Sequence, residues 1–76
     1  MPGIDLINEI RRLRFEHDRM TQQALADKVQ VSRQTIIALE SGRYAPSLVL
    51  AMRIARVFDQ PVESVFQLTD ENFPEE

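Results

Sequence analysis

The chain has 76 residues, the length of one small domain, and its formal net charge at pH 7 is −3. It contains no cysteine, which excludes disulfide bonds and thiolate metal sites. No apolar run reaches the roughly 18 residues of a membrane-spanning helix. Residues 1–5 have no basic signal-peptide start, so we expect a cytoplasmic protein.

The charges are unevenly distributed along the chain. All nine Lys and Arg residues lie between Arg11 and Arg56, a stretch that holds only four acidic residues and therefore has a net charge of +5. From Val57 onward the sequence holds six acidic residues and no basic one. This asymmetry is typical of a protein with a nucleic-acid-binding face and an acidic far side, although small helical proteins without such a partner also carry uneven charge.

The first predicted helix covers about residues 5–16. Leu6, Ile10 and Leu13 recur at helical spacing and form one apolar stripe. The polar segment that follows contains His17, the only histidine of the chain. One imidazole with scattered carboxylates is a poor ligand set, so we expect no metal site, and we expect no cofactor either.

Two short helices joined by a tight turn are predicted next, at about residues 21–29 and 32–41. Thr21 and Ser32 act as their N-caps, because a hydroxyl at this position accepts a hydrogen bond from an amide that the helix leaves unpaired. Gly42 follows the second helix, at the position where a left-handed C-terminal cap favours glycine.

The second of these helices has two different faces. Ile36 and Leu39 lie on one side at helical spacing. Arg33, Gln34 and Ile37 lie on other sides. An arginine can bond guanine, a glutamine can bond adenine, and an apolar side chain can contact the thymine methyl group. The pattern therefore favours a helix that contacts base edges in the major groove of DNA.

Two further helices are predicted, at about residues 47–58 and 61–67. The longer one is apolar on more than one side, which indicates contacts beyond the core of one chain, either with a second copy or with the folded-back tail. Isolated exposed apolar residues are also common, so both interpretations stay open. The candidate dimer contacts are Val49, Met52, Val57 and Phe73.

Three segments resemble those of a known family, namely LRFEHDRMTQQALADKV, VSRQTIIALESGRYAPSL and LAMRIARVFDQPVESVF. On the basis of these segments, residues from about 10 to 66 resemble the lambda-repressor/Cro-like helix-turn-helix regulators, also called the XRE family. The resemblance implies an all-α, five-helix DNA-binding domain over residues 1–68, followed by an acidic tail over residues 69–76.

The resemblance also implies roles for individual residues. The residues expected to contact base edges are Arg33, Gln34 and Ile37, although Arg33 could instead hold a phosphate. Phosphates of the DNA backbone are expected to be held from four positions, namely Gln22, Ser32, Arg43 and Tyr44.

Two more features follow from the same resemblance. In the family, an arginine near the end of the first helix pairs with a glutamate near the end of the recognition helix, and the matching residues are Arg14 and Glu40. Gln30 departs from the family pattern, because the turn usually has glycine at this position. We therefore expect a positive φ at Gln30, which costs a residue with a side chain on the order of 1 kcal/mol.

These expectations combine into one functional hypothesis. The chain is expected to be a transcriptional regulator, in this family commonly a repressor, that binds a pseudo-palindromic double-stranded DNA operator as a homodimer. A protein-interaction module with the same fold, such as an antitoxin or a co-regulator, is the alternative. An enzyme is not expected, because the sequence has no Gly-rich phosphate loop, nucleophile elbow or paired acid/base constellation.

Overall fold

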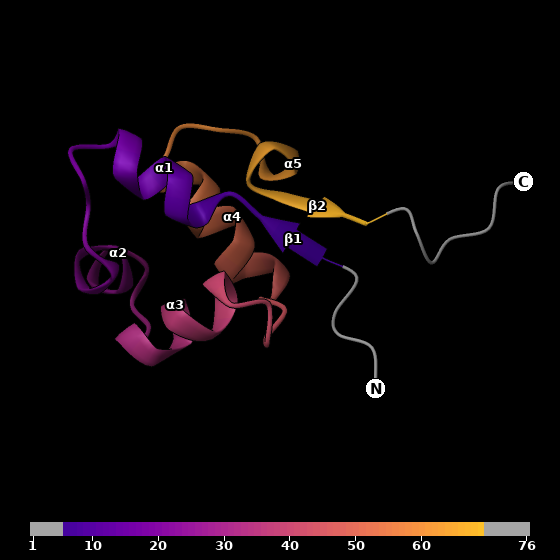
Figure 1. Cartoon of the computed structure of the whole chain (residues 1–76), viewed down its shortest axis with the longest axis horizontal. Helices are drawn as coiled ribbons and strands as arrows, with labels where there is room; N and C mark the ends of the chain where they lie inside the picture. The colour runs from indigo at the N-terminus through magenta and orange to yellow at the C-terminus, as the bar shows by residue number, and fades with distance from the viewer. Residues whose placement is uncertain (1–5, 70–76) are drawn as a thin grey trace, which may run out of the picture.

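The structure, a computed structural model, describes residues 6–69. Within these residues the chain forms five helices and two short strands, in the order β1 (Leu6–Asn8), α1 (Ile10–Glu16), α2 (Gln22–Val29), α3 (Arg33–Glu40), α4 (Leu48–Val57), α5 (Val62–Val65) and β2 (Phe66–Leu68) (Figure 1). Helices dominate the fold, so the expected all-α class is confirmed. The expected tail from residue 70 onward and the candidate contact Phe73 lie outside the described residues.

Hydroxyl side chains begin the three longest helices, and two of these caps, Thr21 and Ser32, were predicted from the sequence. Thr21 Oγ1 accepts a hydrogen bond from the Ala24 amide at the start of α2. Ser32 does the same at the start of α3, and Ser47 at the start of α4. Each cap satisfies an amide that has no partner within its own helix, and so fixes the residue at which the helix begins.

One set of buried apolar side chains joins all five helices. Its fully buried members include one residue from each helix, namely Ile10, Leu25, Ile36, Ile54 and Val65. α4 contacts both α2 and α5 and crosses the middle of the fold (Figure 1). Burial of each such side chain contributes about 1.5–3 kcal/mol, so this core determines how α2 and α3 sit against the rest of the chain.

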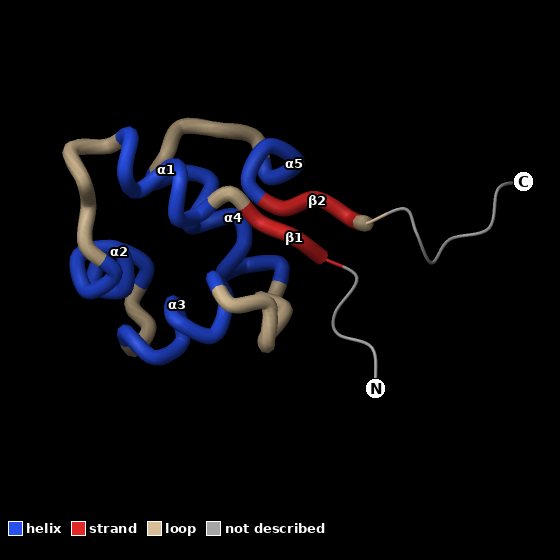
Figure 2. The backbone as a smooth tube through the Cα atoms, viewed as in Figure 1, coloured by secondary structure: helices blue, strands red, loops and turns tan. Residues whose placement is uncertain are grey.

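The two strands form an antiparallel ribbon on one side of the helices (red in Figure 2). Leu6 pairs with Leu68, and Asn8 pairs with Phe66. The amide of Glu9 extends the connection, because it donates to the Val65 carbonyl at 2.8 Å. The ribbon therefore joins the two ends of the described chain beside α5.

The ribbon corrects two helix boundaries predicted from the sequence. The first helix begins at Ile10 rather than near residue 5, and the fifth helix ends at Val65 rather than at residue 67. The apolar spacing around Leu6 fits a helix, but residues 6–8 find backbone partners at the opposite end of the chain. Pairing between distant segments leaves no signal in local periodicity, so the sequence pattern missed it.

Left-handed residues end both helices of the central pair. Gln30 follows α2 at φ 64°, which confirms the positive φ expected there. Gly42 follows α3 at φ 77°. Beyond α3, the Gly42 amide donates to Leu39 O at 3.1 Å and the Arg43 amide donates to Ala38 O at 3.0 Å, an arrangement that completes the end of the helix.

Candidate nucleic-acid interface

The helix α3 presents one face to the core and another to solvent. Ile36 and Leu39 are fully buried between α3 and its neighbours. Arg33 and Gln34 are exposed in the first turn, and Ile37 is 39% exposed one turn later. The three residues expected to contact bases therefore lie on the accessible side of one helix, which is stable because its other side is buried.

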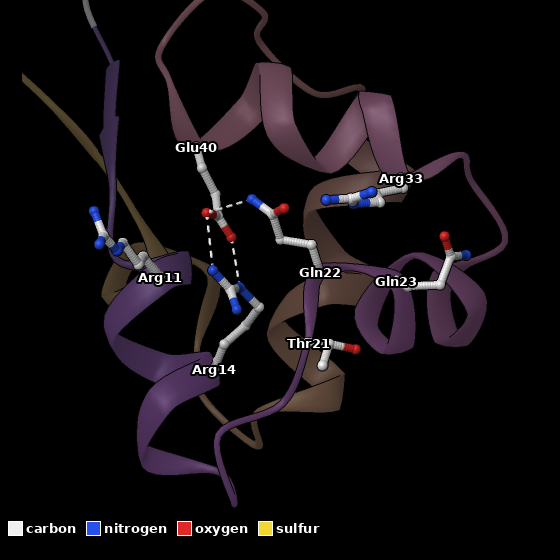
Figure 3. Close-up of a pocket in the computed structure, with 7 residues that line it drawn as sticks. All are labelled: Arg11, Arg14, Thr21, Gln22, Gln23, Arg33 and Glu40. Carbon is white, nitrogen blue, oxygen red and sulfur yellow. Dashed lines mark hydrogen bonds and ion pairs between the residues drawn. The ribbon is translucent and has the colours of Figure 1, made fainter.

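A hydrogen-bonded ion pair holds the C-terminal end of α3 against α1 (Figure 3). Arg14 Nε donates to Glu40 Oε2 at 2.6 Å, and Arg14 Nη2 donates to Glu40 Oε1 at 3.1 Å. The two side chains are only 15% and 10% exposed. The bidentate geometry defines the orientation of both groups, so the structure brings the expected pair together.

Two further contacts extend this pair into α2 and the preceding loop. Gln22 Nε2 donates to Glu40 Oε1 at 3.2 Å from the first turn of α2. Arg14 Nη1 donates to the Met20 carbonyl at 2.8 Å. Three elements therefore meet at Glu40, and the angle between α2 and α3 is fixed by polar contacts as well as by the core.

A polar hollow of about 790 Å³ opens beside this network (Figure 3). Arg33 extends from α3 toward Gln22, and Arg11 lies on the α1 side. Sequence reasoning missed Arg11, although a signal was present, because Arg11 and Arg14 are three residues apart and share one face of a helix. Arg11 and Arg33 therefore place basic groups on two sides of the hollow, an arrangement that suits the sugar–phosphate backbone of DNA.

The four residues expected to hold phosphates lie in different surroundings. Gln22 uses its side-chain amide on Glu40. The Ser32 hydroxyl accepts from the Thr35 amide, which leaves the backbone of its turn as the more suitable phosphate donor. Arg43 and Tyr44 are exposed on the loop between α3 and α4.

The candidate dimer contacts on α4 do not form one patch. Val49 and Met52 are 58% and 55% exposed and line a shallow groove together with Arg53 and Arg56. Val57 is half-buried and packs against the core of its own chain. Only the first two candidates are therefore well placed to contact a second copy.

Within the described part of the chain, no three His, Asp or Glu side chains gather where a metal ion could bind. His17 packs edge-on against Phe58, with 5.1 Å between the ring centroids, and its Nδ1 lies 3.0 Å from the Leu13 carbonyl. The helices between residues 6 and 69 are all too short or too polar to cross a membrane.

Comparisons with known proteins agree with this geometry. Residues 10–65 match the sequence profile of the helix-turn-helix family. An uncharacterized HTH-type transcriptional regulator from Methanothermobacter thermautotrophicus is 50% identical over 66 residues, which cover 82% of this chain and 96% of the relative. Another, YgzD from Bacillus subtilis, is 42% identical over 65 residues, which cover 86% and 97%.

A solved structure supports the fold alone. It is the crystal structure of a Bacteroides fragilis protein thought to bind DNA. The match has a TM-score of 0.70 at 21% sequence identity, and it covers 82% of this chain and 98% of that one.

Proposed function

The chain belongs to the Cro/C1-type (XRE) family of helix-turn-helix transcriptional regulators, and from this premise we propose that it binds specific double-stranded DNA sequences through α3. In this proposal α3 enters the major groove, and a homodimer occupies a pseudo-palindromic operator. The protein acts in the cytoplasm as a repressor that blocks access to the promoter.

One observation carries the proposal more than any other. α3 exposes Arg33, Gln34 and Ile37, while its opposite side is buried. Its C-terminal end is held against α1 by the ion pair between Glu40 and Arg14. A recognition helix needs this combination, because base-edge hydrogen bonds require both accessible donors and a rigid support. A helix that served only to fill the core would not need polar groups held in this way.

The exposed groups match the chemistry of base edges and phosphates. Arg33 can donate two hydrogen bonds to guanine, and Gln34 can both donate to and accept from adenine. Each good bidentate contact discriminates between bases by about 1–3 kcal/mol. Arg43 and Tyr44, together with Arg11, supply phosphate donors that carry no sequence information.

A homodimer follows from the small size of one binding surface. The proposed two-fold assembly sets two copies of α3 about 34 Å apart, on successive major grooves of one DNA face. Among the candidate contacts on α4, Val49 and Met52 are best suited to the interface, because both are exposed and apolar whereas Val57 packs against the core of its own chain.

A protein-interaction module is the second candidate. The observation that favours it is the row of exposed apolar side chains at the start of α4, formed by Leu48, Val49 and Met52. Light scattering followed by duplex titration at two salt concentrations separates the candidates. A monomer whose DNA affinity does not depend on salt would favour this second function, since phosphate contacts always release counterions.

The proposed DNA recognition is tested by comparing two variants on duplexes selected from a random pool. Gln34→Ala should relax the preference at one base pair and cost about 1–3 kcal/mol on the selected duplex. Arg43→Ala should weaken binding to all duplexes alike and lower the slope of log K against log salt by about one. If Gln34→Ala weakens binding to selected and scrambled duplexes equally, as Arg43→Ala is expected to do, the assignment of base contacts to α3 is wrong.

A further inference from the structure

Asn8 connects the β ribbon with the end of α3. It is the last residue of β1, where its backbone pairs with Phe66. Its side-chain Nδ2 donates to the Leu39 carbonyl at 2.8 Å, across 31 residues of sequence. Its Oδ1 accepts from the Ile10 amide at 3.1 Å. One half-buried side chain therefore contacts the first residue of α1 and the last turn of α3.

The orientation of this amide is determined by its partners. The Ile10 amide can only donate, and the Leu39 carbonyl can only accept. If the Asn8 side chain were turned over, an N–H group would face the Ile10 N–H and the side-chain oxygen would face the Leu39 oxygen. Both hydrogen bonds would then be lost, so only the observed orientation satisfies both groups.

The contact joins α3 to the ribbon without being needed to form α3. The Leu39 carbonyl already accepts the Gly42 amide at 3.1 Å, and the neighbouring Ala38 carbonyl accepts the Arg43 amide. The helix end is therefore complete on its own. The additional bond from Asn8 restricts where this end lies relative to β1 and α1.

Two consecutive residues of α3 are held from different directions. The backbone of Leu39 is bonded from β1, and the side chain of Glu40 is bonded by Arg14 from α1. α3 has eight residues and a length of about 12 Å, so a rotation of roughly 5° at this end moves the other end by about 1 Å. A shift of that size takes a base contact outside hydrogen-bond range.

We propose that Asn8 is a positioning residue for DNA recognition. By bonding Leu39 it fixes the angle of α3, so that Arg33 and Gln34 meet the base edges in the correct register. The inference rests on the proposed function of α3, and it adds the ribbon to the parts of the molecule that determine specificity.

Two variants of Asn8 test this role, because each keeps an acceptor for the Ile10 amide and loses the bond to Leu39: the Asp carboxylate has no donor, and the Ser hydroxyl is too short to bridge both partners. Asn8→Asp has the same shape and adds one negative charge, whereas Asn8→Ser is neutral and shorter. Gln67→Glu is the matched control, since it introduces the same charge on β2. Among the described residues the side chain of Gln67 bonds only the nearby Glu63 carbonyl, and the substitution leaves the backbone pairing of Gln67 with Ile7 in place.

Affinity for the selected duplex and for a scrambled duplex is measured well below the melting temperature of each variant. We expect both Asn8 variants to lose about threefold to tenfold on the selected duplex, as for one lost hydrogen bond, with little change on the scrambled one. Gln67→Glu should leave the ratio of the two affinities unchanged. Equal losses on both duplexes, or no loss in either Asn8 variant, would overturn the proposal.

A measurement without DNA separates this inference from the proposed function. Residual dipolar couplings of backbone amides report the angle of α3 relative to α1 in the free protein. Both Asn8 variants should change the couplings of α3 and leave those of α4 unchanged, whereas unchanged α3 couplings would rule out a positioning role. If the wild-type protein binds no duplex, the proposed function fails, while the couplings still decide the role of Asn8.

Discussion

Glu40 accepts hydrogen bonds from Arg14 and Gln22 and lies at the end of α3. At the scale of single residues, we expect substitution of Glu40 to disturb the position of α3 more than any other single change, because contacts from α1 and α2 both converge on it. The pair is largely removed from solvent, so the loss of one partner leaves a charge with no compensation.

We predict that Glu40→Gln destabilises the protein by about 3 kcal/mol, the lower end of the range for breaking a buried pair, because both groups retain some exposure. Urea denaturation gives the free energy of unfolding. The matched control is Glu16→Gln, whose carboxylate bonds Arg12 at an exposed site on α1 and should cost less than about 1 kcal/mol. Equal losses in the two variants would contradict a buried role for Glu40.

Gln30 stores backbone strain at the end of α2, because a left-handed φ of 64° is unfavourable for a residue with a side chain. We predict that Gln30→Gly stabilises the protein by up to about 1 kcal/mol. The gain is reduced because glycine loses more conformational entropy on folding than glutamine does. The control Gln23→Gly places the same change within α2 and should destabilise by roughly 0.5–1 kcal/mol. A thermal melt in which Gln30→Gly shows no gain, or a loss like that of the control, would refute the strain.

Some of these residue roles were predictable from the sequence and others were not. The strain at Gln30 followed from its place in the turn, and the partners Arg14 and Glu40 followed from the family resemblance. Asn8 gave no local signal, because its partner Leu39 comes close only when the ribbon forms. Contacts that depend on distant segments require the three-dimensional arrangement.

At the scale of elements, capped helices were predicted well and the strands were missed. Thr21 and Ser32 marked helix starts that the structure confirms within one residue, and the helix predicted from about residue 47 begins at Leu48. The ribbon was missed because β1 and β2 are three residues each and lie at opposite ends of the chain. Strands this short have too few residues for an alternating pattern to emerge.

The exposed face of α4 gives a prediction at the same scale. If this face forms the homodimer, Met52→Glu places two like charges at an apolar interface and should weaken dimerisation by at least about tenfold. Sedimentation equilibrium measures the effect. Phe15→Glu changes another exposed apolar side chain, on α1, and should have no effect. A dimer that is insensitive to Met52→Glu would place the interface elsewhere.

At the scale of the whole molecule, the architecture separates the supporting core from the exposed side chains that we propose contact DNA. The buried core and α4 hold the helices together, while α3 and the loop after it carry exposed groups suited to DNA. The net charge of −3 is compatible with this function because the basic residues are confined to the stretch from Arg11 to Arg56. Charge distribution, rather than total charge, is therefore the informative quantity.

The central claim is that the outward face of α3 meets the bases. It is tested most directly by following the backbone amide resonances of labelled protein during titration with a duplex selected from a random pool. We predict the largest shifts at residues 32–37, with smaller ones near Gln22 and Arg43. Shifts that gather on α4 and α5 while α3 stays unperturbed would contradict the account.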